Sequence, residues 1–192
     1  MSFTWDRLPV IDAGRVRLRP LTDGDVPALF DVFGDPEVMR YWSSPPIADI
    51  DGAHALLADI HRHFEAKTLF QWGVARLEDD LVIGTTTIFH IDKDHRRAEI
   101  GFALGRRHWG KHYATDAVTA LIRFAFAELD LHRLEADPDP QNAASIAVLT
   151  KQGFEREGLL RERYFLNGEP QDAEYYGLLR REWPPPAPDR SA

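Results

Sequence analysis

The 192-residue sequence predicts an α+β fold in which a mixed central sheet of six to seven strands is flanked by helices. Three observations predict it. Some segments alternate apolar and polar residues with period 2, and others place apolar residues at helical spacing. These segments follow one another as strand, two helices, three strands, helix, strand, helix and two strands, with short hairpin turns between several strands. Hydrophobic residues make up 44% of the chain, which is enough for a packed core.

The N-terminal part is expected to hold one strand and two helices. Residues 16–20 alternate like a strand. Thr22 and Asp23 are suited to cap a following helix that runs to about Phe33, because their side chains can accept from free backbone amides. A second helix is indicated by apolar residues at helical spacing, namely Ile50, Ala53, Leu57, Ile60 and Phe64.

Three strands and a long helix are expected next. The strands cover residues 70–76, 81–90 and 98–104, and a polar turn at 78–80 joins the first two. The helix begins after Gly110. Its apolar face consists of Ala114, Ala117, Val118, Leu121, Ile122, Ala125 and Leu129.

The last third is expected to contain three short strands and one helix. The strands are predicted at 133–136, 154–160 and 174–180. Asn142 is suited to cap a helix over residues 143–152, and Gly153 occupies the position after it that favours a left-handed backbone.

Composition narrows the class of protein. We expect a single domain at residues 1–183, followed by a mobile proline-rich tail at 184–192.

The chain has no cysteine and a net charge of −8, which argues against thiolate chemistry and against a basic nucleic-acid-binding surface. The sequence shows no signal-peptide pattern and no apolar run of the roughly 20 residues that span a bilayer, so we predict a cytoplasmic protein without membrane contact. A homodimer is compatible with the sequence.

The segment 107–115, Arg-His-Trp-Gly-Lys-His-Tyr-Ala-Thr, connects a predicted strand to the long helix. The first turn of a helix leaves backbone amides unpaired and carries partial positive charge, and Gly110 would let a ligand come close to the backbone. Arg107, Lys111 and Thr115 could add charge and a hydroxyl. Together these features suit a pyrophosphate. The alternative is an ordinary strand–helix connection with solvated basic residues.

Several ordered blocks give a resemblance to a known family. Residues 99–104 (Glu-Ile-Gly-Phe-Ala-Leu) and 109–117 (Trp-Gly-Lys-His-Tyr-Ala-Thr-Asp-Ala) resemble the acetyl-CoA-binding core of the GNAT superfamily. Residues 142–145, with 151–154 and 157–158, resemble its next block. Residues 38–42 and 164–168 are similar to the branch that acetylates the N-termini of ribosomal proteins. The resemblance runs from about residue 17 to residue 179.

The resemblance implies a GNAT-like acyl-CoA N-acyltransferase fold with acetyl-CoA as co-substrate and no metal. The pantetheine arm would pair with the backbone of Phe102 and Leu104, the pyrophosphate would lie on the amides of the turn at 110–115, and Asn142 would contact the cofactor. The full set expected to bind acetyl-CoA is Phe102, Ala103, Leu104, Arg107, Trp109, Gly110, Lys111, His112, Tyr113, Ala114, Thr115, Asn142 and Lys151.

The chain departs from the family pattern at two positions. His112 stands where the family usually has Gly or Ala, so its ring would either crowd the phosphates or donate a hydrogen bond to them. Tyr164 stands where the branch has a glutamate that is proposed as general base.

Three residues are therefore candidates for catalysis. An amine attacks only when it is unprotonated, and Glu99 is the first candidate to accept its proton, directly or through water. Ser145 matches the position proposed in the branch to protonate the departing thiolate, and Tyr164 is the alternative acid. The structural alternatives are a carboxylate at a strand start for Glu99, a helix cap for Ser145 and a core or rim tyrosine for Tyr164.

The acceptor is less defined than the cofactor. Trp42 could line the acceptor site or cover the core, and the acidic loop at 137–140 could place carboxylates near the acceptor. We expect a primary amine, with a protein or peptide N-terminus first. The alternatives are a small amine, such as a polyamine, an amino sugar or an antibiotic, and a non-catalytic acyl-CoA-binding domain.

Overall fold

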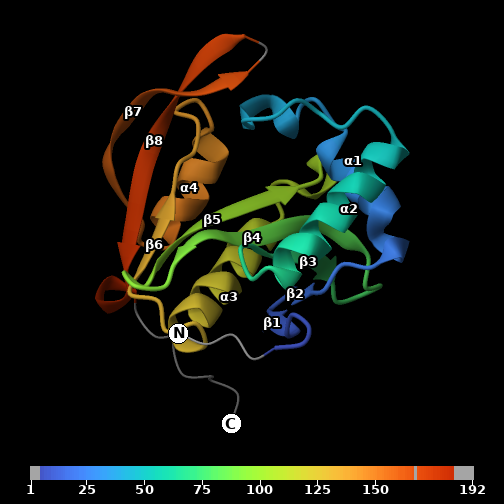
Figure 1. Cartoon of the computed structure of the whole chain (residues 1–192), viewed down its shortest axis with the longest axis horizontal. Coiled ribbons are helices and arrows are strands. Elements are labelled where there is room, and N and C mark those ends of the chain that lie inside the picture. Colours follow the sequence, from blue (N-terminus) through green and yellow to red (C-terminus); the bar gives the residue numbers. More distant parts are fainter. Residues whose placement is uncertain (1–4, 167, 184–192) are drawn as a thin grey trace.

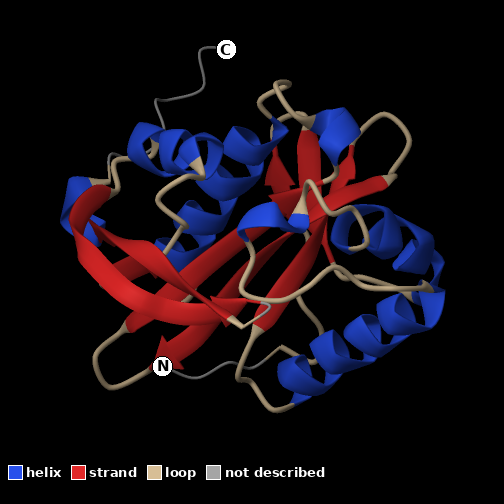
Figure 2. Cartoon of the chain, turned by 90° about the horizontal axis from the view of Figure 1, so that it is seen from above, coloured by secondary structure: helices blue, strands red, loops and turns tan. Residues whose placement is uncertain are grey.

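The structure is a computed structural model of the chain, described here for residues 5–166 and 168–183. The predicted tail at 184–192 lies outside those residues. The fold is α+β, as predicted, with one mixed sheet and helices on both of its faces (Figures 1 and 2). No helix in the described ranges is long and apolar enough to cross a membrane.

The sheet has eight strands in the spatial order β1-β2-β3-β4-β5-β6-β8-β7, slightly more than the six to seven predicted. The additional strand, β1, has three residues. All neighbouring strands are antiparallel except β5 and β6. The strands are β1 (Ile11–Ala13), β2 (Val16–Arg19), β3 (Phe70–Arg76), β4 (Val82–Asp92), β5 (Arg97–Leu104), β6 (Arg133–Ala136), β7 (Glu155–Leu166) and β8 (Glu169–Leu179).

In the part of the chain that the structure describes, four α-helices cover the sheet. They are α1 (Val26–Phe33), α2 (Ile50–Glu65), α3 (Tyr113–Ala127) and α4 (Ala143–Lys151). The apolar face predicted for α3 packs into the larger core cluster together with β2 to β6, while α1 and α2 form a second cluster on the other face. The stripe predicted for α2 is buried at its centre, but Ile50 at the helix start is 42% exposed because it lies in the first turn, beyond the core.

The cap expected at Asn142 forms as a side-chain hydrogen bond, whereas Asp25, and not the side chain of Thr22 or Asp23, accepts the hydrogen bond before α1. The Asn142 side chain accepts from the amide of Ser145 at 3.1 Å and so begins α4. Before α1, the carboxylate of Asp25 accepts from the amide of Thr22 at 2.8 Å, and a short 3₁₀ turn over Asp23–Asp25 precedes the helix. The helix therefore starts at Val26, three residues later than its predicted cap suggests.

The central strands β5 and β6 diverge, and this divergence creates the space for a site. Their parallel pairing covers only residues 97–99 of β5 and residues 133–135 of β6. β5 continues to Leu104 along β4, whereas the chain leaves the sheet after Ala136. The β6-facing backbone edge of residues 100–104 consequently has no strand beside it within the described part of the chain.

Two β-bulges shape the walls of that space. In β4, Phe89 pairs with Glu99 and Asp92 pairs with Arg97, so His90 and Ile91 together oppose a single residue. In the β7–β8 hairpin, residues 161–163 oppose Asp172 alone. Bulges bend a strand and redirect side chains. The hairpin, longer than the strands predicted at 154–160 and 174–180, curves above the sheet (Figure 1).

Candidate active site

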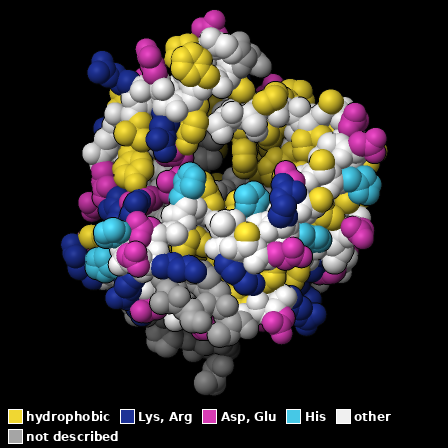
Figure 3. Space-filling model, in the orientation of Figure 1, with side chains coloured by type: hydrophobic (Ala, Val, Ile, Leu, Met, Phe, Trp, Pro, Cys, Tyr) yellow, Lys and Arg dark blue, Asp and Glu magenta, His cyan; other side chains and the backbone are white. Residues whose placement is uncertain are grey.

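A cavity of about 430 Å³ lies where β5 and β6 diverge. The space-filling view shows it as a hollow framed by hydrophobic side chains (Figure 3). We refer to this space as the cavity. Its walls come from β4 and β5, the segments 40–43 and 136–139, α4 and the β7–β8 hairpin, and its polar or ionisable lining residues include Tyr41, Gln71, Thr87, His90, Asp137, Asp139, Ser145, Tyr164, Gln171 and Asp172.

The turn that precedes α3, residues 105–112, is built to expose backbone amides. Gly110 has φ of +72° and His112 has φ of +63°, both in the left-handed region. Asp116 is the first residue of the helix whose amide has a backbone partner, the carbonyl of His112 at 3.1 Å. Among the described residues, the amides of 110–115 have no hydrogen-bond partner. A Cβ at Gly110 would meet nothing within 4 Å, so a ligand can approach the backbone there.

Positive charge surrounds this turn. Arg107 and Lys111 are exposed beside it. The pKa of His108 is lowered, mainly by burial and further by the nearby charges of Arg76, Lys111 and Arg107. The turn is braced from the other end of the sheet by Arg15, which donates to the carbonyl of Lys111 at 3.1 Å and pairs with Asp116 at 2.7 Å. Unpaired amides, local positive charge and a braced backbone together fit a bound pyrophosphate.

The residues expected to hold a pantetheine arm lie on the open edge of β5. The side chain of Phe102 lines the cavity, while Ala103 and Leu104 are buried and could contribute only their backbone. The indole of Trp109 donates to the carbonyl of Leu104 at 2.7 Å, so one lone pair of that carbonyl is already used. The remaining edge can accept an extended chain that adds a short strand-like segment.

Helix α4 presents its first turn to the cavity. Ser145 lines the cavity, and because Asn142 supplies the cap, the serine hydroxyl is not the capping group. The Asn142 carbonyl oxygen is occupied by the cap, which leaves its amide group to face a ligand. Lys151, at the far end of α4, is exposed and does not line the cavity.

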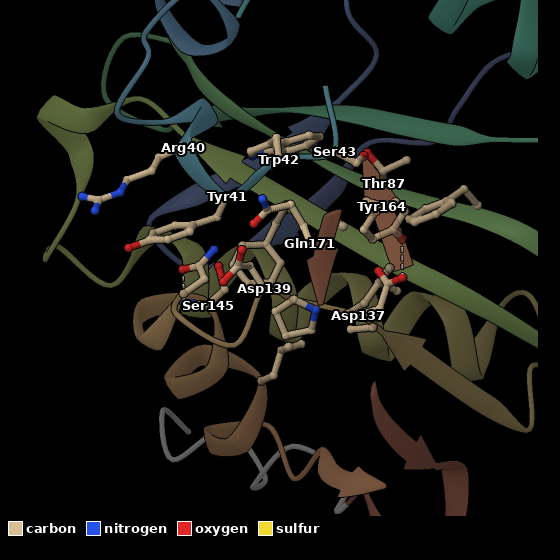
Figure 4. A pocket seen from close by; sticks show the side chains of 18 of the residues that line it. Arg40, Tyr41, Trp42, Ser43, Thr87, Asp137, Asp139, Ser145, Tyr164 and Gln171 are labelled. Carbon is tan, nitrogen blue, oxygen red and sulfur yellow. Dashed lines mark hydrogen bonds between the residues drawn. The ribbon is translucent and has the colours of Figure 1, made fainter. Parts of the chain in front are cut away.

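Tyr164 and Asp137 face Ser145 from the other side of the cavity (Figure 4). The phenol O–H of Tyr164 donates to the carboxylate of Asp137, and Arg163 pairs with the same carboxylate at 3.5 Å. Burial and this carboxylate raise the pKa of Tyr164 to about 12. The phenol is therefore protonated at neutral pH, and its proton is held by a carboxylate. Asp139 and Gln171 lie between the two sides.

Glu99 is placed one layer behind the cavity. Its side chain is 9% exposed, it does not line the cavity, and its Oε1 lies 3.0 Å from Nδ1 of His90, which does line it. Trp42 also lines the cavity and packs edge-to-face on Phe33 with ring centroids 5.4 Å apart. Trp42 therefore has both of the positions considered from the sequence, since it packs against the core and also lines the cavity.

Sequence reasoning missed His90 and Tyr41 as cavity residues. A signal for His90 was present, because the predicted strands 81–90 and 98–104 and the turn between them place His90 close to Glu99 on the neighbouring strand. The bulge that turns the imidazole toward Glu99 has no comparable signal, since one extra residue in a strand leaves the alternating pattern almost unchanged.

Comparisons with known proteins agree with this geometry. Residues 15–155 match the family model described as an acetyltransferase (GNAT) domain. The chain is 30% identical over 164 residues to spermidine N(1)-acetyltransferase of Escherichia coli K12, covering 84% of each chain. It is 37% identical over 107 residues to a protein of Bacillus subtilis 168 named "Putative ribosomal N-acetyltransferase YdaF", covering 56% of this chain and 58% of that protein. A crystal structure of a GNAT-family acetyltransferase from Bacillus anthracis superposes with a TM-score of 0.80 at 25% identity, over 91% of this chain and all of that one.

Proposed function

This chain belongs to the GNAT acetyltransferase family, and we propose that it acetylates the N-terminal amine of a protein or peptide. Acetyl-CoA-dependent N-acetylation follows from the family, and acetyl-CoA supplies the thioester. The acceptor and the roles of individual residues are the proposed part.

The choice of a peptide N-terminus as the acceptor rests on the mixed polar and apolar lining of the cavity. Its walls are largely apolar and aromatic, including Phe33, Trp42 and Phe89. Asp137 is already paired with Arg163 and Tyr164. An acceptor with one cationic amine followed by uncharged atoms suits such walls better than a chain with several charges, because each buried charge needs a partner. A peptide N-terminus has this form.

The proposed cofactor contacts follow from the turn before α3 and the open edge of β5. The amides of 110–115 would hold the pyrophosphate, with Arg107 and Lys111 adding charge. A backbone N–H near Phe102 would donate to the carbonyl oxygen of the thioester as negative charge develops on it. With these contacts the reacting carbon would lie beside the cavity, between β5 and the first turn of α4.

The side chains of the cavity would remove the amine proton and donate a hydrogen bond to the leaving sulfur. Glu99 is proposed to promote removal of the amine proton. Ser145 is proposed to donate a hydrogen bond to the leaving sulfur. Tyr164 is less suited to that second role, because its pKa of about 12 and its bond to Asp137 both oppose loss of its proton.

A thiol-release assay tests the acceptor. The protein is incubated with acetyl-CoA and short peptides that begin with a small residue, with the same peptides blocked at the N-terminus, and with spermidine. We expect release with the free peptides and none with the blocked ones. Equal rates for free and blocked peptides, or release with spermidine alone, would contradict a peptide N-terminus as the acceptor.

A polyamine is the second candidate, favoured by one observation. Asp137, Asp139 and Asp172 all line the cavity, and carboxylates in series are what a chain of ammonium groups requires. The same assay separates the two, because a polyamine site would turn over spermidine faster than any peptide at equal concentration.

A further inference from the structure

His90 and Glu99 form a histidine–carboxylate pair at the wall of the cavity. The imidazole Nδ1 lies 3.0 Å from Oε1 of Glu99. At this distance a ring that carries its hydrogen on Nδ1 can direct it toward the carboxylate, and Nε2 is then the free lone pair of the neutral ring. The exposed fractions of the two side chains are 64% for His90 and 9% for Glu99. The imidazole is thus the accessible member of the pair and the carboxylate the buried one.

The backbone of β4 is distorted in order to make this pair. His90 has φ of +48°, in the left-handed region that a non-glycine residue adopts at a cost of about 1 kcal/mol or more. The residue sits in the bulge between the pairs Phe89–Glu99 and Asp92–Arg97. Without the bulge, strict alternation would set the side chain of residue 90 on the opposite face of the sheet from that of Phe89, whose cross-strand partner is Glu99. Strain of this kind and bulges both concentrate at functional sites.

The neighbouring carboxylate on β6 shows what a purely structural arrangement looks like. Glu135 pairs directly with Glu99 in the parallel register and is equally buried, at 4% against 7%. Both of its oxygens are bonded, Oε1 to Arg133 at 2.7 Å and Oε2 to Arg97 at 2.9 Å. Glu99 has only His90 on Oε1, and its buried Oε2 has no hydrogen-bond partner among the described residues. Leaving such an atom unpaired costs free energy, so the pair is poorly optimised for stability.

We propose that His90 is the group that accepts the proton of the acceptor amine and that Glu99 acts only through it, as a positioning residue. This rests on the acetyl-transfer activity and not on which amine is acetylated. Nε2 takes a proton from the ammonium form of the acceptor, directly or through one water, and passes it to solvent. The freed amine nitrogen attacks the thioester carbonyl, the C–N bond forms and the C–S bond breaks. The second nitrogen proton leaves with the sulfur as the thiol.

The charges around His90 suit this role. Glu99 on β5, in ion-pair contact with the ring, would orient it and attract the positive charge that forms when Nε2 is protonated. On the hairpin, Arg163 pairs with Asp137, which follows β6. The negative charge of Glu99 is one of the smaller causes that raise the pKa of Arg163. Glu99 and Asp137 thus place two carboxylates on this side of the cavity, and Arg163 pairs with one of them. A cationic amine is attracted to this side of the cavity, and the proton it releases is stabilised there.

The test is a double-mutant cycle on the full chain, with His95→Ala as matched control. His95 also pairs with a carboxylate, Asp92, with Nδ1 to Oδ2 at 2.9 Å, but it is exposed outside the cavity. We measure kcat with the best peptide and with spermidine, and the Kd of acetyl-CoA. His90→Ala is expected to lower kcat about 100-fold with an unchanged Kd, in line with the usual contribution of a general base. His95→Ala is expected to keep wild-type kcat.

The decisive comparison is Glu99→Gln in two backgrounds. Alone it is expected to lower kcat clearly, and in the His90→Ala background it is expected to add nothing, because Glu99 acts only through the imidazole. Free imidazole is expected to restore turnover to His90→Ala in a concentration-dependent way. Equal losses from Glu99→Gln in both backgrounds, or a loss below tenfold in His90→Ala, would overturn the proposal. Turnover of spermidine but not of peptides would instead reject only the proposed acceptor, since the cycle can be completed with spermidine.

Discussion

The turn before α3 and the cavity differ in how the chain builds them. The turn is one continuous segment, residues 105–112, and it offers mainly backbone amides whose direction is set by two left-handed residues. The cavity collects side chains from segments as distant in sequence as Trp42, His90, Ser145 and Tyr164. A backbone site depends on φ and on free amides, whereas a side-chain site depends on which strands become neighbours and on how each charge is paired.

This difference explains which function each region can carry. All GNAT proteins must bind one cofactor, and a backbone site tolerates many side chains as long as the turn is kept. Acceptors differ between relatives, and side chains on loops and hairpins can change without altering the sheet. Variants in the turn should therefore change the affinity for acetyl-CoA, and variants in the cavity should change the turnover of the acceptor.

The largest effect is expected at Gly110. Gly110→Val places a branched side chain over the amides and forces a left-handed backbone on valine, and losing two charge-assisted hydrogen bonds would weaken acetyl-CoA binding at least about 100-fold. The measurement is the Kd of acetyl-CoA by calorimetry.

Gly168→Val is the matched control for this experiment. Gly168, in the β7–β8 hairpin, has φ of +83°, and a Cβ there would also meet nothing within 4 Å, so its backbone strain is similar. We expect a comparable loss of stability in both variants but wild-type acetyl-CoA affinity only in Gly168→Val. Equal affinities in the two variants would mean that the pyrophosphate binds elsewhere.

The same difference sets how much could be predicted from the sequence. The order of elements, the cap at Asn142 and the turn at Gly110 follow from local patterns, since each involves residues close in the chain. The three-residue strand β1 is too short for periodicity to register. The bond between Tyr164 and Asp137, and the pair of His90 with Glu99, depend on the bulges in β4 and in the β7–β8 hairpin, which local patterns do not specify.

An intermediate effect is expected at Tyr164, on the cavity side. The pKa of its phenol in the folded chain is about 12, above the usual value of 10, because of burial and the carboxylate of Asp137. A raised folded pKa gives stability that is fully present below pH 10 and is lost as the pH rises through 12. The two-unit shift corresponds to at most ~2.7 kcal/mol, and partial exposure reduces this to about 1–2 kcal/mol.

Urea unfolding of wild type and Tyr164→Phe between pH 9.5 and 12 measures that contribution. The free energy of unfolding should fall more steeply in wild type, and the two curves should converge near pH 12. Tyr175, with a pKa also raised to about 12, remains in both proteins and cancels in the difference. Parallel curves would show that Asp137 does not hold the phenol proton in solution. Acetyl-CoA affinity at pH 8 should be the same in both, because Tyr164 is remote from the turn before α3.

The smallest effect is expected at His112 in the turn, where one variant reports on both the stability of the chain and the affinity for acetyl-CoA. His112 occupies a left-handed position that glycine adopts freely, and its side chain makes no capping bond. Backbone strain alone predicts that His112→Gly raises the free energy of unfolding by about 1 kcal/mol, and Tm by about 2–4 °C. If the ring donates to the phosphates, the same variant should bind acetyl-CoA several-fold more weakly, because it loses that hydrogen bond. A higher Tm together with a weaker Kd would show that the chain gives up backbone stability for a phosphate contact. A higher Tm together with a tighter Kd would show instead that the ring obstructs the turn, and that the amides bind the pyrophosphate without help from this side chain.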